Sequence, residues 1–149
     1  MTNSVEVKIK KLDPAAIVPE YAHSGDAAFD VFALKDTQIA ARDRAIISTG
    51  FAMEFPVGYV GLVWDKGGPP AKFGLTTMAG VIDSGYRGEI LIVMYNTANT
   101  RYTFKRGDKV AQILIQPVVR GKIVQADQLS ATSRAAGRFG STGTRKSTP

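Results

Sequence analysis

The sequence predicts an all-β domain whose strands form a sandwich, a barrel or a jelly roll. Short apolar segments recur along the chain, and helical periodicity is nowhere sustained over three turns. Turn-forming residues separate these segments, among them Asp13-Pro14, Pro56-Val57-Gly58 and Arg106-Gly107-Asp108. Many short strands joined by turns are typical of these β architectures. The 149 residues suit one domain with one hydrophobic core.

The expected strands follow one another along the whole chain. The first, at residues 5–10, alternates apolar and charged side chains, as a half-buried strand does. Further strands are expected at residues 45–51, 59–64, 89–95, 110–119 and 122–124. The run from Ile90 to Met94 is apolar on both faces, so a second sheet or a partner subunit must cover it on both sides.

The composition changes from about residue 130 onward. The last part of the chain is rich in Ser, Thr, Gly, Ala and Arg, with Phe139 as its single large apolar residue. Such a segment cannot bury enough apolar surface to order itself. We therefore expect a β domain at residues 1–129 and a flexible C-terminal tail at residues 130–149.

Composition also restricts the function. The chain has no cysteine, which excludes disulfides, thiolate metal sites and a cysteine nucleophile. The net charge is +6, but the basic residues are scattered and form no stripe with interleaved aromatics, so we expect no nucleic-acid partner. No apolar run approaches the ~20 residues of a membrane span. The N-terminus shows no signal peptide, so no membrane contact and a cytoplasmic location are expected.

The most informative segment is Ala-Gly-Val-Ile-Asp-Ser-Gly-Tyr-Arg-Gly-Glu at residues 79–89. An acid, Asp83, an aromatic ring, Tyr86, and a guanidinium, Arg87, fall within five positions of one small-residue turn. A glycine-tipped β-turn with Asp83 as a turn residue is the simpler interpretation. A strand can end without this set of groups, however, so the pattern indicates chemistry.

Four further segments accompany this one. They are SGDAAFDVFA at residues 24–33, WDKGGPPAKFG at 64–74, RGDKVAQI at 106–113 and RAAGRFGSTG at 134–143. Together the five resemble the signature motifs of the dUTP pyrophosphatases (dUTPases), in the family's order and over nearly the whole chain. The resemblance implies a distorted jelly-roll or β-barrel subunit in a homotrimer. It also implies hydrolysis of dUTP to dUMP and pyrophosphate with Mg²⁺.

The resemblance gives individual residues their expected roles. Asp83 is the base that activates water for attack at the α-phosphorus. Tyr86 packs under the deoxyribose and excludes a 2′-hydroxyl, and the segment from Thr77 to Gly80 reads uracil through main-chain groups. Asp30 holds waters of the Mg²⁺ bound to the triphosphate. In the family, each site takes its first, second and fourth motifs from one subunit, the third from a neighbour and the tail from the remaining one.

The phosphate contacts come from the other motifs. By the same resemblance, the triphosphate is positioned by Lys66, Gln112, Arg134, Ser141 and Thr142. Phe139 is expected to stack over the uracil ring. The tail that carries it would close over the ligand and exclude water.

The second motif departs from the Pro-Arg-Ser-Gly-Leu pattern that is usual in the family. Lys66 falls on the basic position and supplies charge without the bidentate fork of arginine. Gly67 falls on the serine and supplies no hydroxyl, although the N–H groups of Gly67 and Gly68 can form an anion-binding nest. Pro69 and Pro70 lack N–H donors and stiffen the loop.

Two alternatives to a fully active dUTPase remain open. The altered second motif is compatible with an attenuated or non-catalytic trimer that binds nucleotide or acts as a scaffold. The dCTP deaminases share the fold and the trimer, but deamination needs a different acid–base group near the cytosine amine. The match at residues 83–86 favours the dUTPases.

Overall fold

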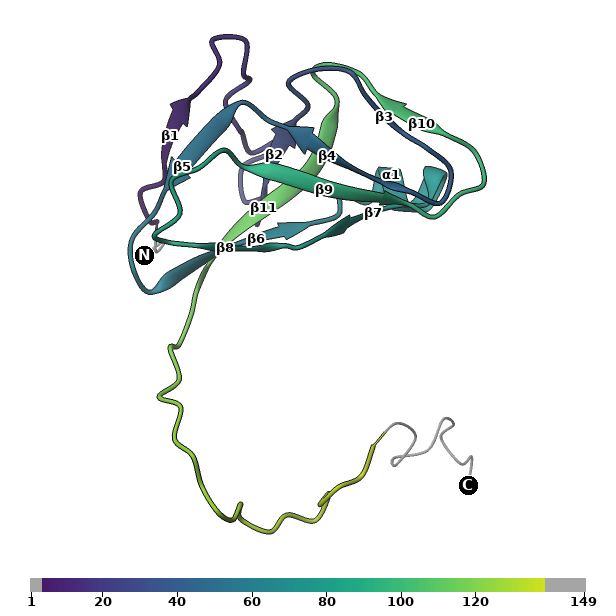
Figure 1. Cartoon of the computed structure of the whole chain (residues 1–149). Helices are drawn as coiled ribbons and strands as arrows, with labels where there is room; N and C mark the ends of the chain where they lie inside the picture. Colours follow the sequence, from purple (N-terminus) through teal and green to yellow (C-terminus); the bar gives the residue numbers. More distant parts are fainter. Residues whose placement is uncertain (1–3, 139–149) are drawn as a thin grey trace.

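The computed structural model describes residues 4–138, and its regular secondary structure is almost entirely β-strand (Figure 1). One short helix, α1, spans Gly68–Phe73. The strands are β1 (Lys8–Lys11), β2 (Phe29–Phe32), β3 (Thr37–Ile39), β4 (Arg44–Ser48), β5 (Phe51–Glu54), β6 (Tyr59–Trp64), β7 (Leu75–Met78), β8 (Val81–Asp83), β9 (Leu91–Asn96), β10 (Tyr102–Phe104) and β11 (Lys109–Pro117).

Two antiparallel sheets carry most of the structure. A four-stranded sheet has the order β2-β11-β6-β8, and a three-stranded sheet has the order β4-β9-β7. The pairs β1–β5 and β10–β3 complete the fold. Inward residues of both larger sheets, such as Val31, Ile113, Ile47 and Ile92, belong to one core cluster. The predicted all-β fold is therefore confirmed.

Strand β9 shows how the core is divided from the surface. Ile92 and Met94 are fully buried, whereas Leu91 is 45% exposed and Val93 is half-buried. Successive side chains of a strand point to opposite faces. The expectation that this strand needs cover on both sides is therefore met on one face only within the subunit.

The end of the chain differs from the prediction. The prediction of a strand at residues 122–124 is wrong, because no strand forms there and Ile123 is 98% exposed. Strand β11 ends at Pro117, and residues 118–138 lead away from the body of the subunit (Figure 1). No described strand pairs with this segment. The predicted domain boundary at residue 129 stays a prediction.

No helix within residues 4–138 has the length and apolar character needed to cross a membrane.

Candidate active site

The outer face of the four-stranded sheet brings together residues from three motifs. Asp30 on β2 lies opposite Gln112 on β11, and Gln112 lies opposite Trp64 at the end of β6. The neighbouring positions Phe29, Ile113 and Val63 also face one another across the same strands. Because these neighbours pack in or against the core, alternation along the strands places Asp30, Gln112 and Trp64 on the opposite face.

Asp30 is held as a buried anion between two lysines. Its side chain is 3% exposed, and Lys66 Nζ donates a hydrogen bond of 2.7 Å to Oδ1. Lys109 Nζ lies 2.7 Å from Oδ2 in an ion pair. Burial alone would raise the pKa of the Asp30 carboxyl, but contact with the two ammonium groups outweighs burial and holds that pKa below its usual value. The same pairing raises the pKa of Lys109.

A cavity of about 580 Å³ opens beside Asp30. It is lined by Asp26, Ala27, Ala28, Asp30, Trp64, Asp65, Lys66, Gln112, Leu114 and Gln116. This volume lies within the roughly 300–1,000 Å³ that is usual for small-molecule sites. Three of the predicted site residues, Asp30, Lys66 and Gln112, therefore line one cavity.

Asp65 organises the loop that carries Lys66. Its Oδ2 accepts a 2.8 Å hydrogen bond from the Thr76 hydroxyl, and its Oδ1 accepts one of 2.5 Å from the Thr77 amide. Its backbone oxygen accepts a 2.8 Å bond from Gln112 Nε2. In this structure Gln112 thus braces the loop. Asp65 and Lys109 were not among the predicted site residues, although both stand inside the motifs that the sequence displays.

The loop of the second motif leads directly into α1. Pro69 and Pro70 lie in the first turn of this helix. Backbone N–H groups have no intrahelical partner there, so proline, which lacks one, breaks no helical hydrogen bond. Gly67 has φ −54° and ψ −29°, a conformation open to any residue, and a Cβ there would meet no atom within 4 Å. The backbone therefore does not require glycine at residue 67. The anion-binding nest expected from Gly67 and Gly68 stays a prediction.

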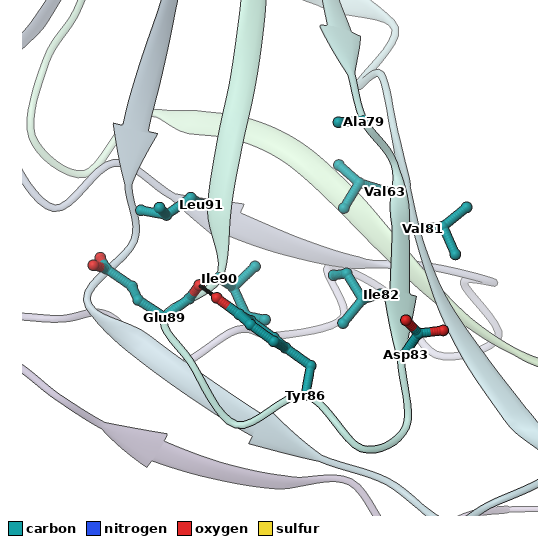
Figure 2. A pocket seen from close by; sticks show the side chains of 9 residues that line it. All are labelled: Val63, Ala79, Val81, Ile82, Asp83, Tyr86, Glu89, Ile90 and Leu91. Carbon is teal, nitrogen blue, oxygen red and sulfur yellow. Dashed lines mark hydrogen bonds between the residues drawn. The ribbon is translucent and has the colours of Figure 1, made fainter.

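Asp83 stands in contrasting surroundings at the end of β8. It is exposed, and its carboxylate forms no hydrogen bond or ion pair with any residue between 4 and 138. The Tyr86 amide donates a 3.0 Å bond to its backbone oxygen and closes the turn that follows. Figure 2 shows the carboxylate pointing away from the Tyr86 ring. The cavity beside these two residues measures only about 210 Å³.

Tyr86 is fixed against the loop between β8 and β9. Its hydroxyl donates a 3.1 Å bond to the Glu89 backbone oxygen, and the ring is directed toward Glu89 (Figure 2). Gly88 makes room for the ring, because a Cβ there would overlap the Tyr86 hydroxyl. The Glu89 carboxylate in turn accepts hydrogen bonds from the Ser48 hydroxyl and the Gly50 amide. These contacts hold the ring in one place.

Gly80 allows two segments of backbone to approach closely. Its oxygen accepts a 2.8 Å bond from the Val63 amide, and a Cβ on Gly80 would lie 2.7 Å from the Val63 oxygen. The expected reading of uracil through main-chain groups already favours a residue without a side chain at Gly80. The structure gives a second reason for glycine, the packing of this crossing against β6.

One subunit keeps the two acids apart. Asp83 lies opposite Val60, and Val60 lies opposite Gln116, four residues beyond Gln112 on β11. Three strand spacings and four residues along a strand place Asp83 roughly 20 Å from Asp30. Within one chain, Asp83, Tyr86 and Gly80 thus form one group, and Asp30, Lys66 and Gln112 form another.

Arg134, the one predicted tail residue that the structure describes, joins neither group. Arg134 lies in the exposed segment 118–138, and its side chain forms no hydrogen bond or ion pair with the described residues. Phe139, Ser141 and Thr142 lie outside the described residues.

The acids fit a magnesium ion held through water better than one bound directly. Among residues 4–138, no group of three or more His, Asp or Glu side chains could hold a metal. The buried Oδ2 of Asp30 faces Lys109 Nζ at 2.7 Å and has no other partner among the described residues, so one of its two lone pairs stays available. An ionised carboxylate with a free acceptor position suits a water molecule of hydrated Mg²⁺.

Comparison with known sequences gives one consistent result. The dUTPase family model matches residues 15–143. The deoxyuridine 5′-triphosphate nucleotidohydrolase of Thermobifida fusca is 43% identical over 143 residues, covering 94% of this chain and 80% of that protein. The protein of the same name from Clostridium acetobutylicum is 40% identical over 144 residues, covering 95% and 99%.

Solved structures agree with this result. The Staphylococcus bacteriophage 80alpha dUTPase with dUpNHpp is similar with a TM-score of 0.83 and 28% identity, over 95% of this chain and 99% of that chain. A mutant dUTPase from phage phi11 of S. aureus, whose structure describes the coordination of a structural Mg(II) ion, is similar with a TM-score of 0.78 and 26% identity, over 85% and 99%. The predicted jelly-roll type of all-β fold is confirmed by this likeness.

Proposed function

Since this chain belongs to the dUTPase family, its reaction is the hydrolysis of dUTP to dUMP and pyrophosphate, and we propose that it works as a homotrimer with active sites shared between subunits. The observation that carries the shared site is the separation of Asp30 from Asp83. One subunit has a cavity of about 580 Å³ at the Asp30 end and a smaller one of about 210 Å³ at the Asp83 end. Each end is completed by the opposite end of a neighbour.

An apolar patch on the three-stranded sheet supports association. Ile46 lies opposite Val93, and Val93 lies opposite Met78, with Leu91 beside them on the same outer face. Ile46 is 62% exposed and Met78 is 46% exposed. Contiguous exposed apolar side chains of this kind mark interaction surfaces. A neighbouring copy of the chain supplies the cover that β9 lacks on this face.

The segment after β11 also supports a shared site. Its apolar side chains Val119, Ile123 and Leu129 are each more than 90% exposed in the single subunit. Contact with a neighbour would bury them and carry Arg134 toward a site that is not its own. Phe139, Ser141 and Thr142 follow in the sequence, and we place them over the uracil and the terminal phosphate of that site.

Asp83 is the proposed general base. Its exposed carboxylate has free acceptor positions for a water molecule, which it orients and deprotonates during in-line attack at the α-phosphorus. Tyr86, braced by Glu89, lies on the other side of the same turn and packs against the deoxyribose. A ring fixed in this way leaves no space for a 2′-hydroxyl.

The Asp30 end of a neighbouring subunit binds the triphosphate. Lys66 lines the cavity and moves its ammonium group from Asp30 to the phosphates, while Lys109 remains paired with Asp30. Gln112 holds the loop and can turn its amide to a phosphate oxygen. Bound Mg²⁺, with waters held by Asp30, supplies charge neutralisation on the triphosphate and the departing pyrophosphate.

The products of dUTP turnover test the function. The protein is incubated with dUTP and with dCTP in the presence of Mg²⁺, and pyrophosphate and ammonia are measured in each reaction. We expect pyrophosphate and dUMP from dUTP and no ammonia from dCTP. Ammonia from dCTP would identify a deaminase. Binding of dUpNHpp without turnover of dUTP would identify a non-catalytic member of the family.

A further inference from the structure

We propose that Asp65 is a positioning residue that sets the discrimination between uracil and cytosine. It does so by fixing the backbone at Thr76 and Thr77. This inference rests on the proposed function, because it concerns how the main chain from Thr77 to Gly80 reads the base.

Asp65 closes the loop between β6 and β7. It stands directly after β6, and its carboxylate accepts hydrogen bonds from Thr76 and Thr77 in β7. The ten residues between, 66–75, include Lys66 and α1. Both ends of the loop are thus joined by one side chain, which couples the position of the phosphate-binding lysine to that of β7.

The Asp65–Thr77 hydrogen bond takes the place of a bond that a neighbouring strand would make at the edge of β7. Strand β7 is at the edge of its sheet and pairs only with β9 among the described strands. An edge strand presents main-chain groups without partners. The Asp65 carboxylate satisfies one of them, the Thr77 N–H, and so fixes the orientation of the peptide between Thr76 and Thr77.

That peptide lies within β7, shortly before the chain crosses between the two sheets. The chain leaves β7 after Met78, passes Ala79 with a φ of +56°, and enters β8 in the other sheet at Val81. Two contacts tie this crossing to the end of β6, the Asp65 bonds on one side and the Gly80–Val63 backbone bond on the other. Loss of Asp65 would remove the hydrogen bonds on the free edge of β7 and leave its pairing with β9 and the Gly80–Val63 bond.

Base discrimination depends on this orientation. Uracil and cytosine present opposite donors and acceptors at the exocyclic position and at N3, so a backbone that reads one base leaves unpaired groups against the other. A site with fixed polar groups discriminates strongly for this reason. A backbone free to rotate its peptides would adapt to both bases and lose that penalty.

The test compares kcat/KM for dUTP with kcat/KM for dCTP in four full-length proteins. Asp65→Ala removes the acceptor, and we expect the dUTP preference to fall at least about tenfold. Asp65→Asn retains Oδ1 as an acceptor for Thr77, and Thr76→Val removes only the hydroxyl partner. Both should keep the preference within about threefold of the parent protein.

Two outcomes overturn the proposal. In the first, Asp65→Ala slows both substrates equally, so that the ratio is unchanged and the role of Asp65 is only structural. In the second, Asp65→Asn loses the preference as fully as Asp65→Ala does. Should Asp65→Ala fail to fold, Asp65→Glu decides, because its longer side chain displaces the acceptor and should also lower the ratio. A parent protein that releases no pyrophosphate from dUTP would refute the proposed function instead.

Discussion

Asp30 and Asp83 stand at opposite corners of one sheet face in surroundings that differ in every respect. Asp30 is buried, lies between two lysines and faces a large cavity. Asp83 is exposed, its carboxylate forms no hydrogen bond or ion pair with the described residues, and it lies beside a small cavity. A carboxylate fixed by cations is suited to act as a permanent charge, whereas one with free acceptor positions can take a proton from water. Environment thus separates two roles that the residue type leaves open.

The largest expected effect comes from Asp83→Asn. The change keeps the size and polarity of an exposed side chain but removes the base, so kcat should fall by about 10²–10⁴-fold. Binding of dUpNHpp, measured by calorimetry, should stay within a fewfold of the parent value. Turnover within a fewfold of the parent would assign the base to another group.

Lys66→Met tests the other corner. Loss of the ammonium group removes a charged hydrogen bond to phosphate, so KM for dUTP should rise by about 10–100-fold. Lys8→Met is the matched control, because Lys8 forms only exposed ion pairs with Glu6 and Glu54. A KM shift that is equal in the two variants would mean that Lys66 is not in the phosphate site.

Gly67→Ser should raise kcat by adding a hydroxyl group to the phosphate site. The backbone at Gly67 accepts a side chain without strain or collision, so serine can present a hydroxyl to the triphosphate. A hydroxyl bond realised in the transition state corresponds to a rise in kcat of about 2–10-fold. Slower turnover in this variant would show that Lys66 and the backbone already suffice.

The smallest effect concerns stability at acid pH. Because the folded state lowers the pKa of Asp30, its ionised carboxylate stabilises the fold above its unfolded pKa of about 3.8. That contribution is lost as the pH falls through the lower folded value. Urea unfolding at pH 6, 4 and 3 should show a smaller loss of stability in Asp30→Asn than in the parent protein.

Asp36 provides the control for this measurement. Its pKa is also lowered, by hydrogen bonds from Lys105 and Arg106, but the group is exposed and screened by water. Asp36→Asn should therefore change the acid slope less than Asp30→Asn does. Equal slopes in the parent protein and Asp30→Asn would show that the two lysines do not stabilise the buried charge.

Local pattern predicted β1 and the four strands of five or more residues, and it missed the other strands, which have three or four residues each. Strand β6 matches the prediction at residues 59–64, because an apolar run between turn residues is visible in the sequence. Strands β3, β8 and β10 have three residues each, too few for alternation to be recognised. The segment at 122–124 has a strand-like pattern but no partner in its own subunit, and pattern alone says nothing of partners.

The sequence predicted which residues form the candidate site, but it did not predict the contacts between their side chains. Asp30, Lys66 and Gln112 were recognisable from their motifs, and the structure places all three at one cavity. The pairing of Lys109 with Asp30 depends on the register between β2 and β11, which the sequence does not display. The side-chain bonds of Asp65 likewise depend on how the loop returns to β7.

Mixed trimers of two defective subunits test the shared site most directly. Asp83→Asn and Lys66→Met subunits are refolded separately and together in equal amounts, and dUTP hydrolysis is measured well below the KM of the Lys66→Met protein. If a neighbour supplies Asp83, about a quarter of the sites in random trimers combine an intact Lys66 with an intact Asp83. A site shared between subunits should therefore recover about a quarter of the parent activity. Activity no higher than that of the separately refolded variants would place the whole site within one subunit and contradict it.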